Sequence, residues 1–515
     1  MATDSHFVAG AADAPKERTF FGHPWALANL SGVEMWERFS FYGLQALLAY
    51  YLYYTVDQGG LGLNKEAALS IVGAYGGLVY LTSVAGAWVA DRILSAERTL
   101  FYSAILIMIG HISLALLPGL AGVGVGLVCV AVGSGALKTT SQVLLGSLYD
   151  REDQRRDGGF SIYYMGVNIG GFLGPILTNA FWGWKGFHWG FGTAAVLMAI
   201  GLIQYTVMRS HTVEVAGHEV ANPLPRSRYL PVALGCLAVI VAVVVLFATG
   251  VLQLGHLSTV VAALTVLAAV ALWVQMYRSR LVTDGERARL VGFIPMFAAS
   301  VVFWSVFQQQ FTVIALYSDE RLNRTVLGHE LPPGVVQSLN PLFVIIFAGV
   351  FAAMWTRLGK RQPSYAGKFS LALAIIGVAI LLFLPFAGGG VNSTPFFAIV
   401  AILFLFTMGE LMLSPVGNSM ATLVAPQAYP TRTFALWLLS VALGTTLSGT
   451  LAGFYDPSSA SGERTYFVAT AAVCFILAVV VFTSRGWITR KLGETAEKPH
   501  KAQAEGHDSR HRGSA

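Results

Sequence analysis

The sequence predicts an all-α membrane protein. Of its 515 residues, 55% are hydrophobic and only 12% are charged, and its mean hydropathy of +0.62 is high for a soluble chain. Apolar stretches of about twenty residues, the length of α-helix that crosses a bilayer core of about 30 Å, recur along nearly the whole chain. Because backbone polar groups find no partner in lipid, these spans must be helices.

Fourteen spans are expected, separated by turn-forming breaks such as "LPGLAGVG" and "YDPSSASGER". The expected helices cover approximately residues 27–54, 67–90, 99–119, 122–148, 159–182, 188–208, 230–249, 255–277, 290–317, 335–356, 366–386, 395–424, 430–453 and 465–485. No secretory signal is evident in the polar N-terminal tail, residues 1–24, and the basic C-terminal tail, residues 491–515, is expected to be disordered.

The distribution of basic residues predicts that both termini are cytoplasmic. Four connections on the side of the termini are rich in Lys and Arg: "DRILSAER", "DREDQRRD", "RSRLVTDGERAR" and "TRLGKRQPSYAGK". The connections on the other side hold only Lys65, Lys185, Arg321, Arg324 and Arg464. This is the positive-inside pattern. The net charge of +6 therefore reflects this orientation and the basic C-terminal tail and does not indicate a nucleic-acid partner. The hydrophobic spans make the lipid bilayer the expected surroundings of the chain.

Five charged side chains lie inside expected spans: Glu34, Glu37, Arg38, Lys138 and Glu410. Each costs about 2.5–3.5 kcal/mol if it faces lipid at mid-membrane, so we expect them to face a shared wet cavity or one another. The first three share one helical face, since i,i+3 and i,i+4 residues are neighbours. An ion pair that only fixes helix packing is one interpretation. The extra acid favours another, a carboxylate that takes up and releases a proton.

The same stretch carries a family resemblance. "EMWERFSFYG" resembles the Glu-x-x-Glu-Arg-Phe signature of the proton-dependent oligopeptide transporter (POT, or PTR) family, and "GAWVADR" resembles the signature between helices 2 and 3 of the wider major facilitator superfamily. "FSIYYMGVNIGGFLGP" resembles the family's helix-5 motif, while "SLNPLFVIIFAGVFAAMW" and "GELMLSPVGNSMATLVAP" resemble its helices 8 and 10. The match runs from about residue 20 to 490.

The resemblance implies a major facilitator fold of bacterial type. Two six-helix bundles, residues 25–210 and 289–490, would enclose a cavity at mid-membrane. Residues 211–288 would be a linker carrying a helical hairpin, and because its two helices are apolar all round we expect both to be exposed to lipid. The implied activity is import of di- and tripeptides, and of peptide-like drugs, by proton-driven alternating access across the bacterial cytoplasmic membrane. No cofactor other than the coupling proton is expected.

The expected site has two parts. Proton coupling is assigned to Glu34, Glu37 and Arg38. The substrate would contact residues from both bundles, with its carboxylate at Arg38 and Lys138 and its ammonium at Glu410, helped by two asparagines. The proposed substrate contacts are Arg38, Tyr42, Tyr80, Lys138, Tyr163, Asn168, Trp304, Gln308, Asn340, Glu410, Ser414 and Trp437. For the aromatic residues, which the resemblance places at the cavity, core packing is the alternative, and for the asparagines it is a hydrogen bond to a neighbouring helix.

One position departs from the family pattern. In "FWSVFQQQF", Gln308 stands where bacterial members usually have a glutamate, so Lys138 is expected to meet a neutral amide in place of an acid. A relative that carries another solute, such as nitrate or a drug-like compound, is the rival interpretation within the family. A channel and an intramembrane enzyme are the alternatives from other classes. No arrangement of nucleophile and base supports an enzyme, and the three cysteines have no disulfide or metal-ligand spacing.

Overall fold

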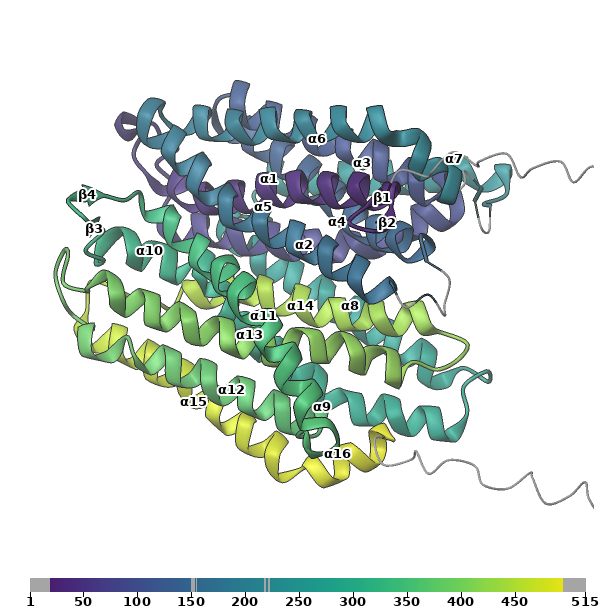
Figure 1. Cartoon of the computed structure of the whole chain (residues 1–515). Helices are drawn as coiled ribbons and strands as arrows, with labels where there is room; N and C mark the ends of the chain where they lie inside the picture. Colours follow the sequence, from purple (N-terminus) through teal and green to yellow (C-terminus); the bar gives the residue numbers. More distant parts are fainter. Residues whose placement is uncertain (1–18, 150–152, 154, 217–218, 221–222, 494–515) are drawn as a thin grey trace, which may run out of the picture.

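The computed structural model describes residues 19–149, 153, 155–216, 219–220 and 223–493 (Figure 1). The two expected tails therefore lie largely outside the described residues. Two very short antiparallel hairpins, β1–β2 and β3–β4, accompany the helices. Their strands are Thr19–Phe20, His23–Pro24, Thr325–Val326 and His329–Glu330.

The first half of the chain forms one bundle. Helix α1 packs against α5 and α6, and α3 packs against α4 and α6. A π-helical turn, Ala90–Leu94, follows α2, and a 3-10 turn, Val56–Gln58, follows α1. The helices are α1 (Trp25–Tyr53), α2 (Lys65–Val89), α3 (Ala96–Leu116), α4 (Gly119–Ser147), α5 (Arg156–Lys185) and α6 (Phe187–Ala216).

The second half forms another bundle, in which α12 packs against α13 and α15, and α14 against α9. The expected helix 290–317 is interrupted by a 3-10 turn, Gln308–Phe311, because Thr312 leaves helical geometry at φ −121° and ψ −94°. Further 3-10 turns are Pro333–Ser338, Gly359–Arg361 and Leu384–Phe386. The helices are α9 (Asp284–Phe307), α10 (Val313–Glu320), α11 (Leu339–Leu358), α12 (Tyr365–Leu381), α13 (Phe396–Val424), α14 (Pro430–Ala452), α15 (Ala460–Thr483) and α16 (Arg485–Leu492).

Length and composition allow thirteen helices of the described residues to cross a membrane. Helix α1 is not among them, although its 29 residues are long enough, because its charged residues lower its hydropathy. The buried positions of α1 include Glu34, Glu37 and Arg38, so these charges face protein. Together with the thirteen other helices, α1 gives the expected fourteen spans, and its charges are accommodated because neighbouring helices cover them.

The two hairpin helices differ from each other. Helix α7 (Tyr229–Ala248) has no buried residue. Helix α8 (Leu257–Arg278) packs against both α2 and α14. The expectation that both helices are exposed to lipid is therefore wrong for one face of α8, while its outer face, which includes Leu264 and Leu267, stays exposed. The physical reason is a stripe of small side chains on one face, which lets the helix backbones approach closely; the stripe consists of Ser258, Ala262, Thr265 and Ala269.

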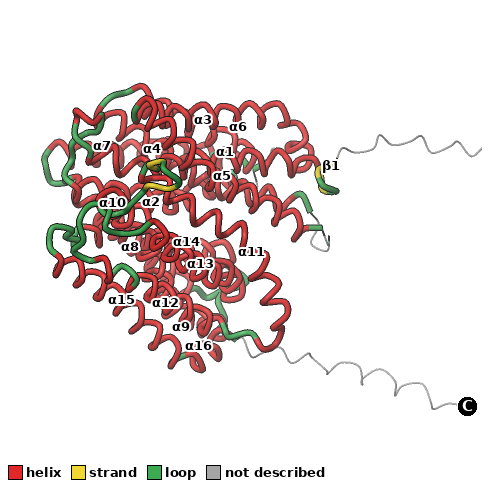
Figure 2. The backbone as a smooth tube through the Cα atoms, turned by 60° about the vertical axis from the view of Figure 1, so that its left-hand side comes forward, coloured by secondary structure: helices red, strands yellow, loops and turns green. Residues whose placement is uncertain are grey.

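The two ends of the molecule differ in how tightly the bundles are joined. Strands β1 and β2 and helix α16 lie at one end, here called the termini side, while α10, β3 and β4 lie at the opposite end, the far side (Figures 1 and 2). At the far side α2 meets α14 so closely that a Cβ on Gly73 would lie 2.6 Å from the Gly449 Cα. The phenols of Tyr53 and Tyr54 both donate to the Asp319 carboxylate at 2.7 Å.

Candidate functional site

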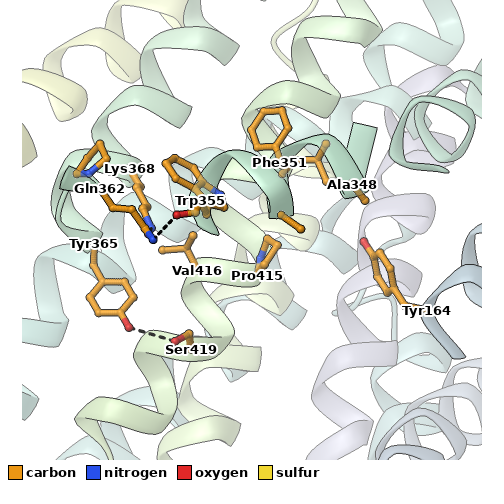
Figure 3. Close-up of a pocket in the computed structure, with 13 residues that line it drawn as sticks. Tyr164, Ala348, Phe351, Trp355, Gln362, Tyr365, Lys368, Pro415, Val416 and Ser419 are labelled. Carbon is orange, nitrogen blue, oxygen red and sulfur yellow. Dashed lines mark hydrogen bonds between the residues drawn. The ribbon is translucent and has the colours of Figure 1, made fainter. Parts of the chain in front are cut away.

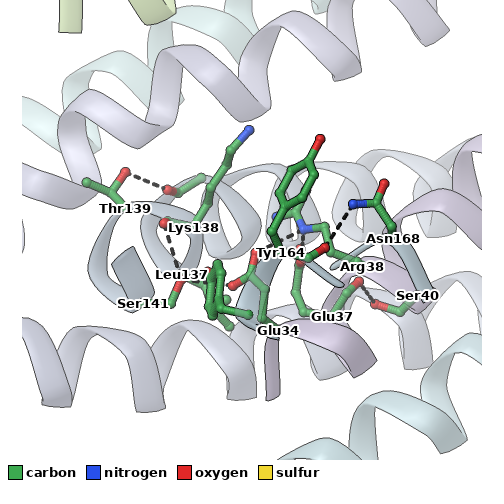
Figure 4. Close-up of polar contacts among 12 residues, drawn as sticks. Glu34, Glu37, Arg38, Ser40, Leu137, Lys138, Thr139, Ser141, Tyr164 and Asn168 are labelled. Carbon is green, nitrogen blue, oxygen red and sulfur yellow. Dashed lines mark hydrogen bonds and ion pairs between the residues drawn. The ribbon is translucent and has the colours of Figure 1, made fainter. Parts of the chain in front are cut away.

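The charged stretch of α1 forms a compact buried cluster. Arg38 Nε lies 3.1 Å from Glu34 Oε1 and 2.6 Å from Glu37 Oε2, as Figure 4 shows. The exposed fractions of Glu34, Glu37 and Arg38 are 2%, 0% and 4%. One guanidinium therefore serves two carboxylates. Burial of an unbalanced acid is unfavourable unless it binds a proton or a further cation.

The two acids occupy different environments. Glu34 lines the central cavity described below, and its Oε2 accepts a hydrogen bond from Ser141 Oγ at 2.8 Å. Ser141 is itself joined to the Tyr163 hydroxyl at 2.7 Å. Glu37 has no exposed surface, and its ion-pair partner is Arg38. Glu34 therefore borders the cavity, whereas Glu37 is separated from it by its neighbours.

Lys138 on α4 faces the same cavity without an acidic partner. Its Nζ lies 4.2 Å from the centroid of the Tyr80 ring, in cation–π contact. It forms no ion pair or hydrogen bond through Nζ with any residue that the structure describes. Gln308 lines the cavity too, but the expected contact between its amide and Lys138 is not made. An ammonium placed this way is available to an anion in the cavity.

The opposite wall of the cavity comes from the second bundle and carries the acid Glu410 on α13. Asn340 Nδ2 donates to Glu410 Oε2 at 2.9 Å and to Thr407 Oγ1 at 3.0 Å. Asn340 thus positions the carboxylate. Asn168, the other asparagine expected to help bind the ammonium, also lines the cavity, and its Nδ2 donates to the Tyr164 carbonyl of its own helix at 2.8 Å. Its local partner is the i−4 carbonyl, available in any helix.

A cavity of about 200 Å³ joins the two walls. It brings together nearly all the expected substrate contacts, which are Arg38, Tyr42, Tyr80, Lys138, Tyr163, Asn168, Trp304, Gln308, Asn340, Glu410 and Ser414. Trp437 lies just outside. It lines an adjoining hollow of about 130 Å³ together with Tyr80, Lys138 and Trp304, and its indole Nε1 donates to Asn418 Oδ1 at 2.8 Å.

Sequence reasoning missed several cavity residues, notably Gln142, Tyr164 and Asn418. Each had a signal. Gln142 lies one helical turn beyond Lys138, and Tyr164 and Asn418 fall inside the quoted motifs of the fifth and tenth family helices. The apolar members Val167, Phe307 and Phe311 also fall inside motifs described above, but their apolar side chains do not distinguish them from the rest of each span.

The cavity continues toward the termini side. Two larger hollows, of about 460 and 520 Å³, reach the ends of the helices there. One shares Tyr164 with the cavity, and the other shares Thr139 with the hollow beside Trp437. Toward the far side, the contacts of α2 with α14 and of Tyr53 and Tyr54 with Asp319 join the two bundles.

The arrangement suits a ligand that carries both a negative and a positive charge. Cations on the first bundle face an acid on the second across one cavity, and charge-assisted hydrogen bonds to both ends of a ligand are the strong kind. Within the described part of the chain, no group of three or more His, Cys, Asp and Glu side chains is placed to hold a metal ion.

Comparisons with known proteins agree with this geometry. Residues 97–468 match the model of the POT family. The chain is 39% identical to the uncharacterized transporter YclF of Bacillus subtilis, covering 90% of this chain and 93% of that protein. It is 34% identical to a di-/tripeptide transporter of Lactococcus lactis, and the match covers 93% of this chain and 98% of that protein. A crystal structure of a peptide transporter POT in complex with sulfate superposes on this chain with a TM-score of 0.87 at 39% identity. The superposition covers 92% of this chain and 97% of the other.

Proposed function

The chain belongs to the POT family of membrane transporters, and from this premise we propose that it is a proton-coupled symporter that imports di- and tripeptides by alternating access. The observation that carries the proposal is the placement of Arg38 and Lys138 on one wall of a single cavity and of Glu410 on the other. The relative from Lactococcus lactis, named a di-/tripeptide transporter, supports the same substrate class. Peptide-like drugs with both charged ends would bind in the same way.

The substrate is held by its backbone ends. Its carboxylate binds Arg38 and Lys138, and its ammonium binds Glu410, which Asn340 holds in place at 2.9 Å. Every zwitterionic peptide has these two groups, so side chains of different shapes are accepted. The Lys138 ammonium supports this assignment, since it forms no ion pair with any acid among the described residues and faces the cavity.

The proton is carried by the pair Glu34 and Glu37. Both share Arg38, so protonation of one acid weakens its hold on the guanidinium and frees Arg38 for the substrate carboxylate. When the cavity opens to the side of lower proton concentration and the substrate leaves, Arg38 returns to the acids and the proton is released. The coupling proton is the only cofactor in this scheme.

Alternating access follows from the two bundles. The termini side is assigned to the cytoplasm of a bacterium, in agreement with the basic connections found there, and the described arrangement is then cytoplasm-facing. Import requires the contacts at the far side to separate while the hollows on the termini side close. No covalent chemistry is involved, and the protein is not an enzyme in this proposal.

The test is uptake of labelled dialanine into proteoliposomes, with and without an inward proton gradient. Accumulation above equilibrium that is abolished by a proton-conducting ionophore is expected, with recovery of intact dialanine. Arg38→Lys is the matched variant: it keeps the charge but loses the fork geometry that serves two carboxylates, and we expect loss of accumulation. Nitrate uptake without dialanine uptake, non-saturating flux or hydrolysed product would refute the proposal in favour of another solute, a channel or an enzyme.

A further inference from the structure

A hollow of about 460 Å³, here called the side pocket, lies beside the central cavity on its termini side (Figure 3). It is built by α11, α12 and α13 of the second bundle, with Tyr164 of α5 opposite them (Figure 3). Its lining is Tyr164, Ala348, Phe351, Ala352, Trp355, Gln362, Pro363, Tyr365, Lys368, Leu411, Pro415, Val416 and Ser419.

The side pocket is lined by aromatic side chains and by one basic side chain, that of Lys368. Phe351 and Trp355 come from α11, where Ala348 and Ala352 leave the open space between them. Lys368 is 8% exposed. Its Nζ lies 4.2 Å from the centroid of the Trp355 ring and donates to Gln362 Oε1 at 2.8 Å. A large apolar group would pack against the aromatic side chains, and a second cation near Lys368 would be repelled.

The side pocket adjoins the central cavity at Tyr164 and along α13. Tyr164, which is 44% exposed, lines both spaces. On α13, Glu410 and Ser414 line the cavity, while their sequence neighbours Leu411 and Pro415 line the pocket. The pocket therefore begins beside the carboxylate assigned to the ammonium of the peptide.

We propose that the side pocket receives the side chain of the N-terminal residue of the peptide and selects large apolar or aromatic residues at that position. The inference rests on the proposed function, because the first Cα is one bond from the ammonium at Glu410. The C-terminal residue lies toward Arg38 and Lys138 on the other wall, away from this pocket. Lys368 disfavours Lys or Arg as the first residue.

The experiment is competition against labelled dialanine by the isomers Phe-Ala and Ala-Phe, with Lys-Ala and unlabelled dialanine for reference. The favourable free energy of burying an aromatic ring in an apolar site leads us to expect a roughly tenfold or larger preference for Phe-Ala over Ala-Phe. Lys-Ala should compete less well than dialanine. Equal competition by the two isomers would overturn the proposal.

Ala348→Phe fills the side pocket and should remove the preference for Phe-Ala while leaving dialanine uptake close to normal. Val350→Phe is the matched control, since it adds the same side chain to α11 at a position that is 57% exposed and does not line the pocket. Ala352→Phe is a second filling variant in case the first does not fold. An equal loss for all peptides in both filling variants, or an unchanged preference, would refute the side-chain role.

The outcomes also separate this inference from the function on which it rests. If the unaltered protein takes up dialanine but shows no isomer preference, the side pocket has another use and the peptide symporter stands. If dialanine is not taken up at all, the proposed function itself fails.

Discussion

Helix α8 joins the two bundles through Ser258, and this contact yields a quantitative prediction. The Ser258 hydroxyl lies 3.0 Å from Ser70 Oγ on α2, and it accepts a hydrogen bond from Thr450 Oγ1 on α14 at 3.0 Å. The Ser258 amide also donates to Ser70 Oγ at 3.1 Å. Ser70 and Ser258 are each 1% exposed. Any separation of α2 from α14 at the far side breaks at least one of these bonds.

Ser258→Ala removes the two hydroxyl hydrogen bonds but keeps the one from the backbone amide. Hydrogen bonds between helices in membranes average about 0.6 kcal/mol, with a maximum of about 1.7 kcal/mol. Because separation of α2 from α14 must break at least one of the two, they stabilise the joined far side by at least about 0.6–1.7 kcal/mol, which corresponds to roughly a 3- to 20-fold change in an equilibrium constant. The variant should shift the protein by that factor toward the arrangement with the far side open.

Distances between spin labels, measured by pulsed electron paramagnetic resonance in lipid nanodiscs, report this shift. Val56 after α1 and Leu327 between β3 and β4 are 76% and 95% exposed, lie at the far side and belong to different bundles. The long-distance population should rise in Ser258→Ala. Leu264→Ala, a change on α8 at a position that is 52% exposed, should leave it unchanged. Identical distance distributions for the two variants would show that α8 does not hold the far side together.

Three further predictions concern the cavity. Glu37→Gln should abolish proton-driven accumulation of dialanine yet leave counterflow exchange, which moves no net proton; full accumulation would contradict the role of the acid pair. N-acetylated dialanine should compete with labelled dialanine at least about tenfold less well than free dialanine, since it has lost a charge-assisted contact with Glu410, and equal competition would exclude that contact. Gln308→Glu should place an acid beside Lys138 and weaken peptide affinity, measured by competition across a range of pH. If the unaltered protein lacked coupling and this change restored it, the proton site would lie on α9 and not on α1.

Local features of the site could be predicted from the sequence. The contact of Glu34 with Arg38 follows from their i,i+4 spacing, which any α-helix brings together. The need for a cavity followed from the energy of placing five charges inside spans. The position of the substrate contacts came with the family motifs, and most of those residues line one cavity.

Tertiary packing decided what each of these side chains faces. Glu34 and Glu37 look equivalent in the sequence, but α1 packs against neighbouring helices so that only Glu34 borders the cavity. Asn340 donates to Glu410 on a neighbouring helix, whereas the amide nitrogen of Asn168 donates to the carbonyl of Tyr164 on its own helix. Lys138 and Gln308 share the cavity without a hydrogen bond between them. These outcomes depend on the relative rotation of helices far apart in the sequence, which periodicity within one helix does not contain.

The helical hairpin formed by α7 and α8 shows most clearly that sequence alone does not determine which surface a helix faces. Helices α7 and α8 are both apolar enough to span a membrane, because a surface that faces lipid and one that faces another helix are both apolar in a membrane protein. The stripe of small residues from Ser258 to Ala269 was present in the sequence, but its meaning depended on which surface lay opposite. The sequence by itself determined that these segments are helices that can span a membrane. Only the tertiary structure decided that α8 packs against α2 and α14 while α7 stays exposed, since that choice rests on close contact between backbones contributed by both bundles.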